Sequence, residues 1–225
     1  MPPDTAAAIR HWGETLGLGL ADGQVDALAA YLALLQRWNA TYNLTAVRDP
    51  GEMRTQHLAD CLAVVPALRR WRRAHPLARR VLDVGSGGGL PGVVFAITEP
   101  DLQIVCVDTV GKKVAFIRQV ALELQLSNLT AEHARVESLP APAFDLVVCR
   151  AFASLADFVA LTQRALAPGG MWMAMKGRPP GDEIAALPTT SAHVFHVEPI
   201  AVPDLQAERC VVWMQLPTAP APESG

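Results

Sequence analysis

The chain has 225 residues, of which 51% are hydrophobic and 18% charged, and its formal net charge at pH 7 is −3. This composition is typical of a globular protein with one sizeable core, and the net charge argues against coating nucleic acid by bulk electrostatics, although a local basic patch is compatible with it. No apolar run reaches transmembrane length and the N-terminus lacks a signal-peptide pattern, so we expect a cytoplasmic protein.

The first third of the chain has helical periodicity. Val25, Leu28, Leu32 and Leu35 recur at steps of three and four, and residues 51–68 show a second such stripe. The segment that follows carries six arginines and a proline, and we interpret it as a junction, residues 69–80. We therefore expect three parts: a helical N-terminal cap, a main domain and a disordered Pro/Ala-rich tail, residues 1–78, 79–217 and 218–225.

From residue 80 short β-branched runs alternate with helical stretches. Strands are predicted over 80–85, 102–108, 129–136, 144–150, 171–177, 192–200 and 208–216, and helices over 89–99, 111–126 and 155–166. Alternation of this kind predicts a parallel, doubly wound sheet. The last two strands can pair antiparallel, because their connection is too short for a crossover helix.

The four cysteines form no C-x-x-C pair and have no His/Cys spacing that suits zinc: Cys61, Cys106, Cys149 and Cys210. Thiols in apolar runs behave as small hydrophobes, so we expect packed, reduced cysteines and no bound metal.

A glycine-rich loop follows the first predicted strand. Glycines at 87, 89 and 92 match the spacing G-x-G-x-x-G of a dinucleotide site, but Asp83 precedes Gly85 and Gly87 in the pattern D-x-G-x-G-x-G. An acid at the end of the strand would repel phosphates and suits a cation. S-adenosylmethionine (SAM) has no phosphate and carries a sulfonium and an ammonium group, so it fits this loop better. The alternative role for Asp83 is that of a hydrogen-bonded loop carboxylate.

Asp108 ends the second predicted strand, where it can accept hydrogen bonds from a ribose diol. This feature suits SAM and dinucleotides alike. Together with the D-x-G-x-G-x-G loop and the antiparallel end of the sheet, it favours a SAM-dependent methyltransferase with an α/β, Rossmann-like fold, a mostly parallel seven-stranded sheet and an antiparallel C-terminal strand.

Several stretches then resemble one family in order along the chain. They are RWNATYNLTAVRDPGEM (37–53), HLADCL (57–62), DVGSGGGLPG (83–92), DTVGKKVAFI (108–117), RVESL (135–139), CRAFASL (149–155) and AMKG (174–177). They resemble the RsmG (GidB) family, whose members methylate N7 of a guanine in bacterial small-subunit (16S) ribosomal RNA. The resemblance spans roughly residues 25–180. It implies a class I SAM-dependent methyltransferase domain with a helical N-terminal cap, and SAM as cofactor. One departure is Cys61, where the family usually has serine.

By position, the resemblance implies cofactor contacts at Gly85, Leu90, Val136, Glu137 and Arg150. Arg150 would bind the SAM carboxylate or an RNA phosphate, or else form a local ion pair. Glu137 would meet the adenine edge, or be an exposed glutamate at the start of a helix.

Guanine N7 has an in-plane lone pair and no proton, so direct SN2 transfer needs no general base. Catalysis would come from alignment, and no residue is assigned as catalytic; Arg150 and Asn43 are positioning candidates. Asn43 and Thr45 could lie near the substrate or simply cap a helix.

The ribosomal RNA, free or in a particle, would be held by local basic residues: Arg72, Arg73, Lys112, Lys113, Lys176 and Arg178. The run RRWRR (69–73) could equally be a solvated helix end. The rival functions are a small-molecule methyltransferase, a non-catalytic SAM-binding or RNA-binding module, and a nicotinamide oxidoreductase. We expect a monomer.

Overall fold

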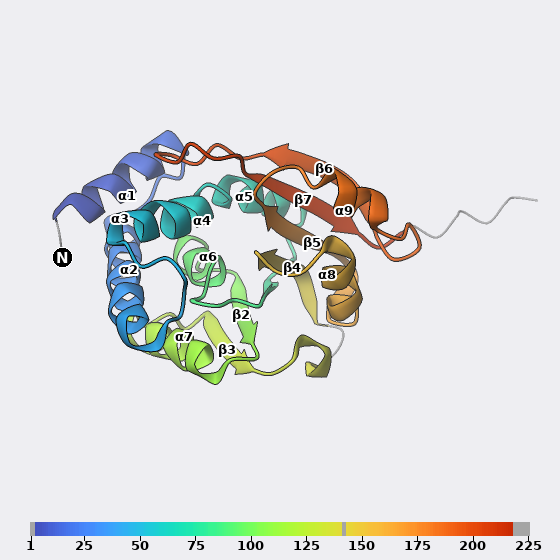
Figure 1. Cartoon of the computed structure of the whole chain (residues 1–225), viewed down its shortest axis with the longest axis horizontal. Coiled ribbons are helices and arrows are strands. Elements are labelled where there is room, and N and C mark those ends of the chain that lie inside the picture. Colours follow the sequence, from blue (N-terminus) through green and yellow to red (C-terminus); the bar gives the residue numbers. More distant parts are fainter. Residues whose placement is uncertain (1–2, 141–142, 218–225) are drawn as a thin grey trace, which may run out of the picture.

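The computed structural model describes residues 3–140 and 143–217, so the predicted tail lies outside the described residues. Its centre is a seven-stranded sheet in the order β3-β2-β1-β4-β5-β7-β6 (Figure 1). The strands are β1 (Arg80–Val84), β2 (Gln103–Asp108), β3 (Leu129–His133), β4 (Phe144–Arg150), β5 (Leu166–Lys176), β6 (His193–Pro199) and β7 (Cys210–Gln215). Strands β1 to β5 pair in parallel and β7 runs antiparallel to both neighbours, which confirms the predicted fold class.

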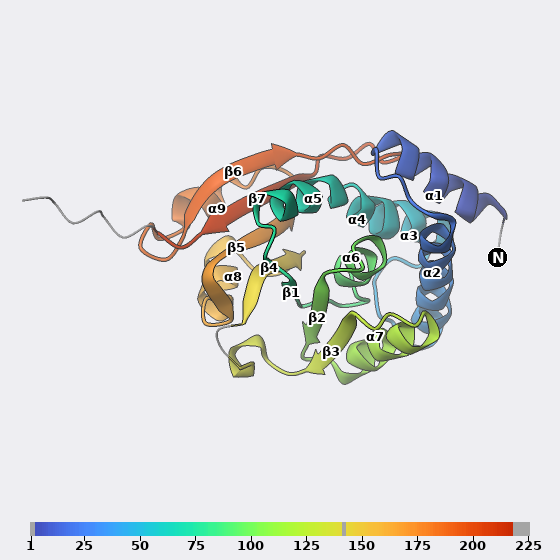
Figure 2. The same cartoon turned by 180° about the vertical axis from the view of Figure 1, so that it is seen from behind.

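Helices cover both faces of the sheet (Figures 1 and 2). They are α1 (Pro3–Thr15), α2 (Asp22–Tyr42), α3 (Pro50–Met53), α4 (Asp60–Leu62), α5 (Val65–Ala74), α6 (Gly92–Thr98), α7 (Gly111–Glu123), α8 (Leu155–Thr162) and α9 (Gly181–Ala186), with a π-helical turn η1 (Arg54–Ala59) and a 3₁₀ turn η2 (Val136–Ser138). Among the described residues, no helix is long and apolar enough to cross a membrane.

Alternation along the strands separates two apolar cores. Val81 and Val148 point into one core with α1, α2 and α5 to α7, whereas Leu82 and Val147 point into the other with α8. The first core runs without interruption from the N-terminal helices into the sheet, across the predicted boundary at 78/79. The N-terminal helices therefore cover one face of the sheet, and that boundary stays a prediction.

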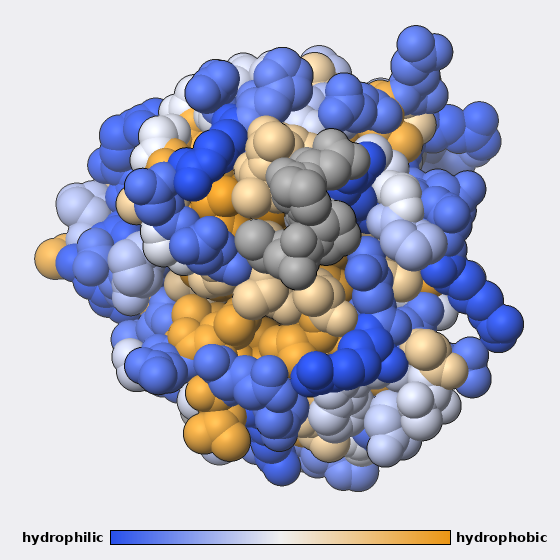
Figure 3. Space-filling model, turned by 90° about the vertical axis from the view of Figure 1, so that its left-hand side faces the viewer, coloured by the Kyte–Doolittle hydropathy of each residue, from blue (hydrophilic) through white to orange (hydrophobic). Residues whose placement is uncertain are grey.

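On the side of the molecule where α1 and α2 lie, a hydrophobic patch sits among hydrophilic residues (Figure 3). Partly buried side chains of this region, such as Leu16 and Leu20, pack against the first core. Leu16 and Leu20 belong to the loop between α1 and α2, which therefore leaves part of its apolar surface accessible.

Three local predictions were wrong. Residues 51–68 do not form one helix but α3, η1, α4 and the start of α5. The π-helical turn interrupts the regular α-helical hydrogen bonds, and Pro66 lies in the first turn of a new helix, α5. The arginine-rich segment is not simply a junction: its first half, residues 69–74, completes α5, which buries Leu68 and Trp71, and residues 75–79 connect α5 to β1. Strand β5 begins earlier than predicted, at Leu166, beside an irregularity in its pairing with β4.

Candidate active site

The loop between β1 and α6 contains three glycines with positive φ, Gly85, Gly87 and Gly89, and the first two begin the turn. Gly85 has φ +65°, and a Cβ there would lie 2.7 Å from Cδ2 of Phe152. Gly87 has φ +57°, and a Cβ there would face open space, with Gly85 O the nearest atom at 3.9 Å. L side chains rarely adopt such angles, so glycine is required for the turn and leaves room beside it.

This loop borders a cavity of about 200 Å³ at the carboxyl ends of β1, β2 and β3, where an open parallel sheet places its ligand. Its lining is Val84, Gly85, Val107, Asp108, Thr109, Ala134, Arg135, Val136, Glu137, Phe152 and Leu161. Of the predicted cofactor residues, the structure brings four to this cavity: Gly85, Asp108, Val136 and Glu137.

Asp108 is held by the backbone around it. Its Oδ2 accepts from the Gly87 N–H at 2.9 Å, its Oδ1 accepts from the Val110 N–H at 2.9 Å, and Lys113 Nζ lies 3.9 Å away. A carboxylate can accept about four hydrogen bonds, so acceptor capacity remains on the cavity side. The carboxylate is thus oriented in advance for a pair of hydroxyl donors.

The opposite wall comes from η2. Val136 is buried, whereas Glu137 is exposed. Oε1 of Glu137 lies 3.1 Å from Nη2 of Arg135. A hydrogen bond from its own backbone N–H lowers the pKa of Glu137 below its usual value, and a hydrogen bond from the Arg135 side chain lowers it further. This wall therefore presents an apolar surface next to a charged carboxylate.

Asp83 lies outside the lining of this cavity. It is fully buried, its Oδ2 accepts the Gly92 N–H at 2.8 Å, and its buried Oδ1 has no hydrogen-bond partner among the described residues. Burial raises the pKa of Asp83 to about 7. The carboxylate holds the first turn of α6 and does not line the cavity at Asp108, so its contact with the SAM ammonium group stays a prediction.

Leu90 is also buried and does not line the cavity. The back of the loop is supported instead by α2, whose Tyr31 hydroxyl donates to the Gly88 carbonyl at 2.6 Å. Sequence reasoning missed Tyr31, because its position in an apolar helical stripe predicts only a packing role.

Arg150 turns away from the cavity and towards the cap. Its Nη1 donates to the Gln56 carbonyl at 3.2 Å and lies 3.4 Å from both Asp60 Oδ2 and His57 Nδ1. Of the alternatives left open by the sequence, the local ion pair is the one observed. Asp60 also accepts from Arg209 Nε at 2.7 Å, and neither His57 nor Asp60 was singled out from the sequence.

Two buried groups near this edge titrate in opposite senses. Burial is the main cause that lowers the pKa of His57 from 6.5 to about 4, and the charge of Arg150 is the second. Between pH 4 and pH 6.5, His57 is therefore neutral in the folded chain and protonated in the unfolded chain. Its contribution to stability is lost as pH falls. Asp83, with a pKa raised from 3.8 to about 7, takes up a proton on folding, and its contribution is lost as pH rises.

We expect His57→Gln to remove only the first of these two effects. Relative to the unmodified chain, the free energy of unfolding of the variant should rise by about 3 kcal/mol as pH falls from 7.5 to 4. Urea denaturation at a series of pH values measures this difference. His11→Gln is the matched control, because His11 is exposed on α1. If the free energy of unfolding depended on pH in the same way for His57→Gln and for the unmodified chain, the expectation would be contradicted.

The predicted RNA contacts fall into two groups. Lys112 and Arg178 are exposed near the carboxyl ends of β2 and β5. Lys176 is at the same edge, but its ammonium donates to Glu183 and to the Ala153 carbonyl. Lys113 is next to Asp108.

Arg72 and Arg73 lie at the end of α5, and Arg72 pairs with Asp101 at 3.0 Å, just before the amino end of β2. The structure does not bring these two arginines to the cavity.

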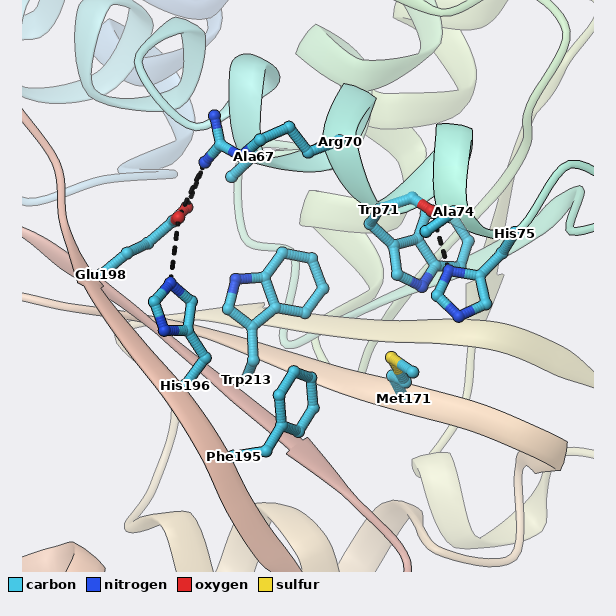
Figure 4. Close-up of a pocket in the computed structure, with 10 residues that line it drawn as sticks. All are labelled: Ala67, Arg70, Trp71, Ala74, His75, Met171, Phe195, His196, Glu198 and Trp213. Carbon is cyan, nitrogen blue, oxygen red and sulfur yellow. Dashed lines mark hydrogen bonds and ion pairs between the residues drawn. The ribbon is translucent and has the colours of Figure 1, made fainter.

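A separate cavity of about 230 Å³ lies between α5 and strands β5, β6 and β7 (Figure 4). Trp71 stacks on His75 with ring centroids 5.5 Å apart, and Arg70 pairs with Glu198 at the other end. None of its lining residues borders the cavity at Asp108, so it is not part of the candidate site.

Asn43 ends α2 with φ 49° and accepts from Arg48 Nη2 at 3.2 Å. It lines a polar cavity of about 260 Å³ together with Gln36, Asn39, Ala40, Arg48, Pro50 and Met53. Its helix-capping role is observed, and its predicted role in positioning substrate stays a prediction.

The sheet order, the glycine turn after β1 and the acid after β2 define a class I SAM-dependent methyltransferase fold. Solved structures agree on the fold: TrmN from Thermus thermophilus (TM-score 0.52, 21% identity, 69% of this chain and 48% of that one) and ribosomal protein L11 methylase from Lactobacillus delbrueckii subsp. bulgaricus (TM-score 0.52, 13% identity, 73% and 79%).

Two proteins named ribosomal RNA small subunit methyltransferase G are much closer in sequence. The one from Acidovorax ebreus is 60% identical over 92% of this chain and 94% of its own length, and the one from Leptothrix cholodnii is 59% identical over 96% and 97%. The family model GidB, described as rRNA small subunit methyltransferase G, matches residues 24–212. The chain therefore belongs to the GidB family, which confirms the resemblance seen in the sequence.

Proposed function

We propose that this chain transfers a methyl group from SAM to N7 of a guanine in 16S ribosomal RNA, by direct displacement. Family membership over residues 24–212 is the observation that carries the proposal. The proposed substrate is cytoplasmic, so the cytoplasm is the expected location. We also propose that the chain acts as a monomer.

The cavity suits SAM chemically. Its charged groups are Arg135 and two carboxylates, Asp108 and Glu137, and the carboxylates accept hydrogen bonds from hydroxyl and amine donors. The backbone at Gly87 is open to an approaching ligand, because no side chain occupies the space where its Cβ would point. Both features are compatible with SAM, and the choice of SAM over a nicotinamide dinucleotide rests on the family membership.

When bound, SAM supplies a methyl group activated by its sulfonium. We assign Asp108 to the ribose hydroxyls, Val136 and Glu137 to the adenine, and the turn at Gly85 to the remaining part of the cofactor. Asp83 acts indirectly, by fixing the start of α6. Guanine N7 carries a lone pair and no proton, so the residues of the mouth need to align the reactants and exclude water, and none has to remove a proton.

We assign the RNA backbone first to Lys112 and Arg178, because they are exposed on the edge where the cavity lies. Lys113 is next to Asp108, and Lys176 holds Glu183, so their roles in RNA binding are secondary. Arg72 and Arg73 would contact RNA only if the substrate extends around to the other edge of the sheet.

Incubation with labelled SAM and either unmodified small ribosomal subunits or free 16S RNA tests the function. We expect label on a single guanine, at N7, with one of the two substrates, and the position of the modified base identifies the target. A metabolite extract without RNA is the control for a small-molecule methyltransferase. Label that is absent from every guanine N7 would refute the proposal.

A further inference from the structure

A chain of polar side chains connects the loop after α2 to the end of β4. Thr45 Oγ1 lies 2.7 Å from His57 Nε2, and Nδ1 of the same ring lies 3.4 Å from Nη1 and Nη2 of Arg150. Thr45 belongs to the loop between α2 and α3, His57 to η1, and Arg150 ends β4. The imidazole thus ties a loop of the N-terminal region to the carboxyl edge of the sheet, where the cofactor cavity opens.

The direction of each hydrogen bond follows from the chemistry of the groups. Because a guanidinium only donates, we assign His57 Nδ1 as the acceptor and the ring hydrogen to Nε2, which then donates to Thr45 Oγ1. The pKa of His57, lowered to about 4 by burial and by Arg150, keeps the ring neutral near pH 7. Thr45 Oγ1 also accepts from the Val47 N–H at 3.3 Å.

Both lone pairs of the Thr45 hydroxyl are therefore engaged, and its own hydrogen is left to donate. No acceptor for this hydrogen is found within residues 3–140 and 143–217. The side chain is partly exposed, so a ligand can reach it. The protein thus presents a hydroxyl that acts only as a donor towards an incoming molecule.

The loop that carries this hydroxyl is held in place by a buried amide. Asn39 Oδ1 accepts from the Thr45 N–H at 2.8 Å, and Asn39 Nδ2 donates to the Val47 carbonyl at 3.0 Å. Asn39 is only 5% exposed. The hydroxyl is therefore oriented before any ligand arrives, which lowers the entropy cost of using it.

Asp60 anchors the other end of the network. It lies 3.4 Å from Nη1 of Arg150 and accepts from Arg209 Nε at 2.7 Å. Arg209 precedes β7, whose first residue pairs with Lys176 at the end of β5. Two elements of the carboxyl edge are thus joined to the turn that holds His57, so the position of Thr45 relative to this edge is well defined.

We propose that Thr45 is a specificity-determining residue whose hydroxyl, oriented by His57 and Asn39, donates a hydrogen bond to an acceptor atom of the RNA nucleotide that enters the site. The inference rests on the proposed function. The cofactor is not the partner, because Thr45 does not line the cavity at Asp108. Arg48 is exposed on the same loop and adds the positive charge that an RNA strand favours.

Three replacements of Thr45 separate donation from loop structure. Thr45→Val keeps the shape and removes the hydroxyl, and Thr45→Asp keeps an acceptor for His57 and Val47 but cannot donate when ionised. We expect both to lower kcat/KM for RNA by about tenfold or more, at an unchanged Kd for SAM. Thr45→Ser keeps the donor and should restore kcat/KM to within about threefold of the unmodified chain.

Thr55→Val is the matched control, because the Thr55 hydroxyl donates to the carbonyls of Gly51 and Glu52, one helical turn before it. Unchanged kcat/KM for Thr45→Val would overturn the proposal, and so would a Thr45→Asp variant as active as Thr45→Ser, since the hydroxyl would then serve only the loop. Both outcomes require methylation by the unmodified chain. Its absence would refute the proposed function instead.

Discussion

Replacing Asp108 with asparagine is expected to weaken SAM binding by about 100-fold while the chain remains folded. Hydrogen bonds that involve a charged group contribute about 1.5–3 kcal/mol each, and the amide retains only one acceptor oxygen. The lost oxygen either faced the ribose or held the backbone of Gly87 or Val110. Isothermal titration calorimetry with SAM measures the effect directly.

Glu132→Gln provides the control for Asp108→Asn. Glu132 is an exposed carboxylate on the neighbouring strand β3 and does not line the cavity, so its neutralisation changes the overall charge equally without touching the site. The Kd for SAM should stay within about threefold of that of the unmodified chain. Equal losses in the two variants would show that general charge, and not Asp108 itself, governs cofactor binding.

The largest expected effect on stability comes from Gly92→Ala. A Cβ at Gly92 would lie 2.5 Å from Sγ of Cys106 and 2.8 Å from Oδ2 of Asp83, and both neighbours are fully buried. Neither group can move into solvent, so α6 must shift and the bond from the Gly92 N–H to Asp83 must lengthen. We expect a loss of about 3 kcal/mol in the free energy of unfolding, measured by urea denaturation.

Gly23→Ala is the opposite case. Gly23 lies in the first turn of α2, and a Cβ there would meet nothing within 4 Å. Alanine favours helix over glycine by up to about 1 kcal/mol, so this variant should be as stable as the unmodified chain or slightly more stable. If Gly92→Ala and Gly23→Ala had the same free energy of unfolding, the packing of α6 against Cys106 of β2 would have room for the extra methyl group, and the expectation would be wrong.

Several features of the site could be predicted because they depend on short stretches of sequence. The turn at Gly85 and Gly87 follows directly after an apolar strand, and Asp108 ends the next one. Parallel neighbouring strands place their carboxyl ends together, so the cavity formed by these residues was predictable before any coordinates were known.

Arg150 shows where this reasoning stops. Its position at the end of β4 predicted a ligand contact, but whether a guanidinium turns towards a cavity or towards a carboxylate depends on what packs above it. Asp60 and Arg209 lie far from it in sequence, and their approach is decided by the way the N-terminal helices and β7 meet the sheet. No local pattern encodes such a meeting.

Asp83 illustrates the same limit. The sequence correctly placed an acid ahead of the glycine turn, and the tertiary structure decided that this acid is sealed behind Cys106 and Gly92.

The sequence by itself determined the succession of strands and helices along the chain, the glycine turn, the acid after β2 and the family, because periodicity and motifs are local or follow chain order. Only the tertiary structure decided which polar groups face the cavity and which satisfy one another, since burial forces each group to find a partner among residues that the chain brings together from a distance.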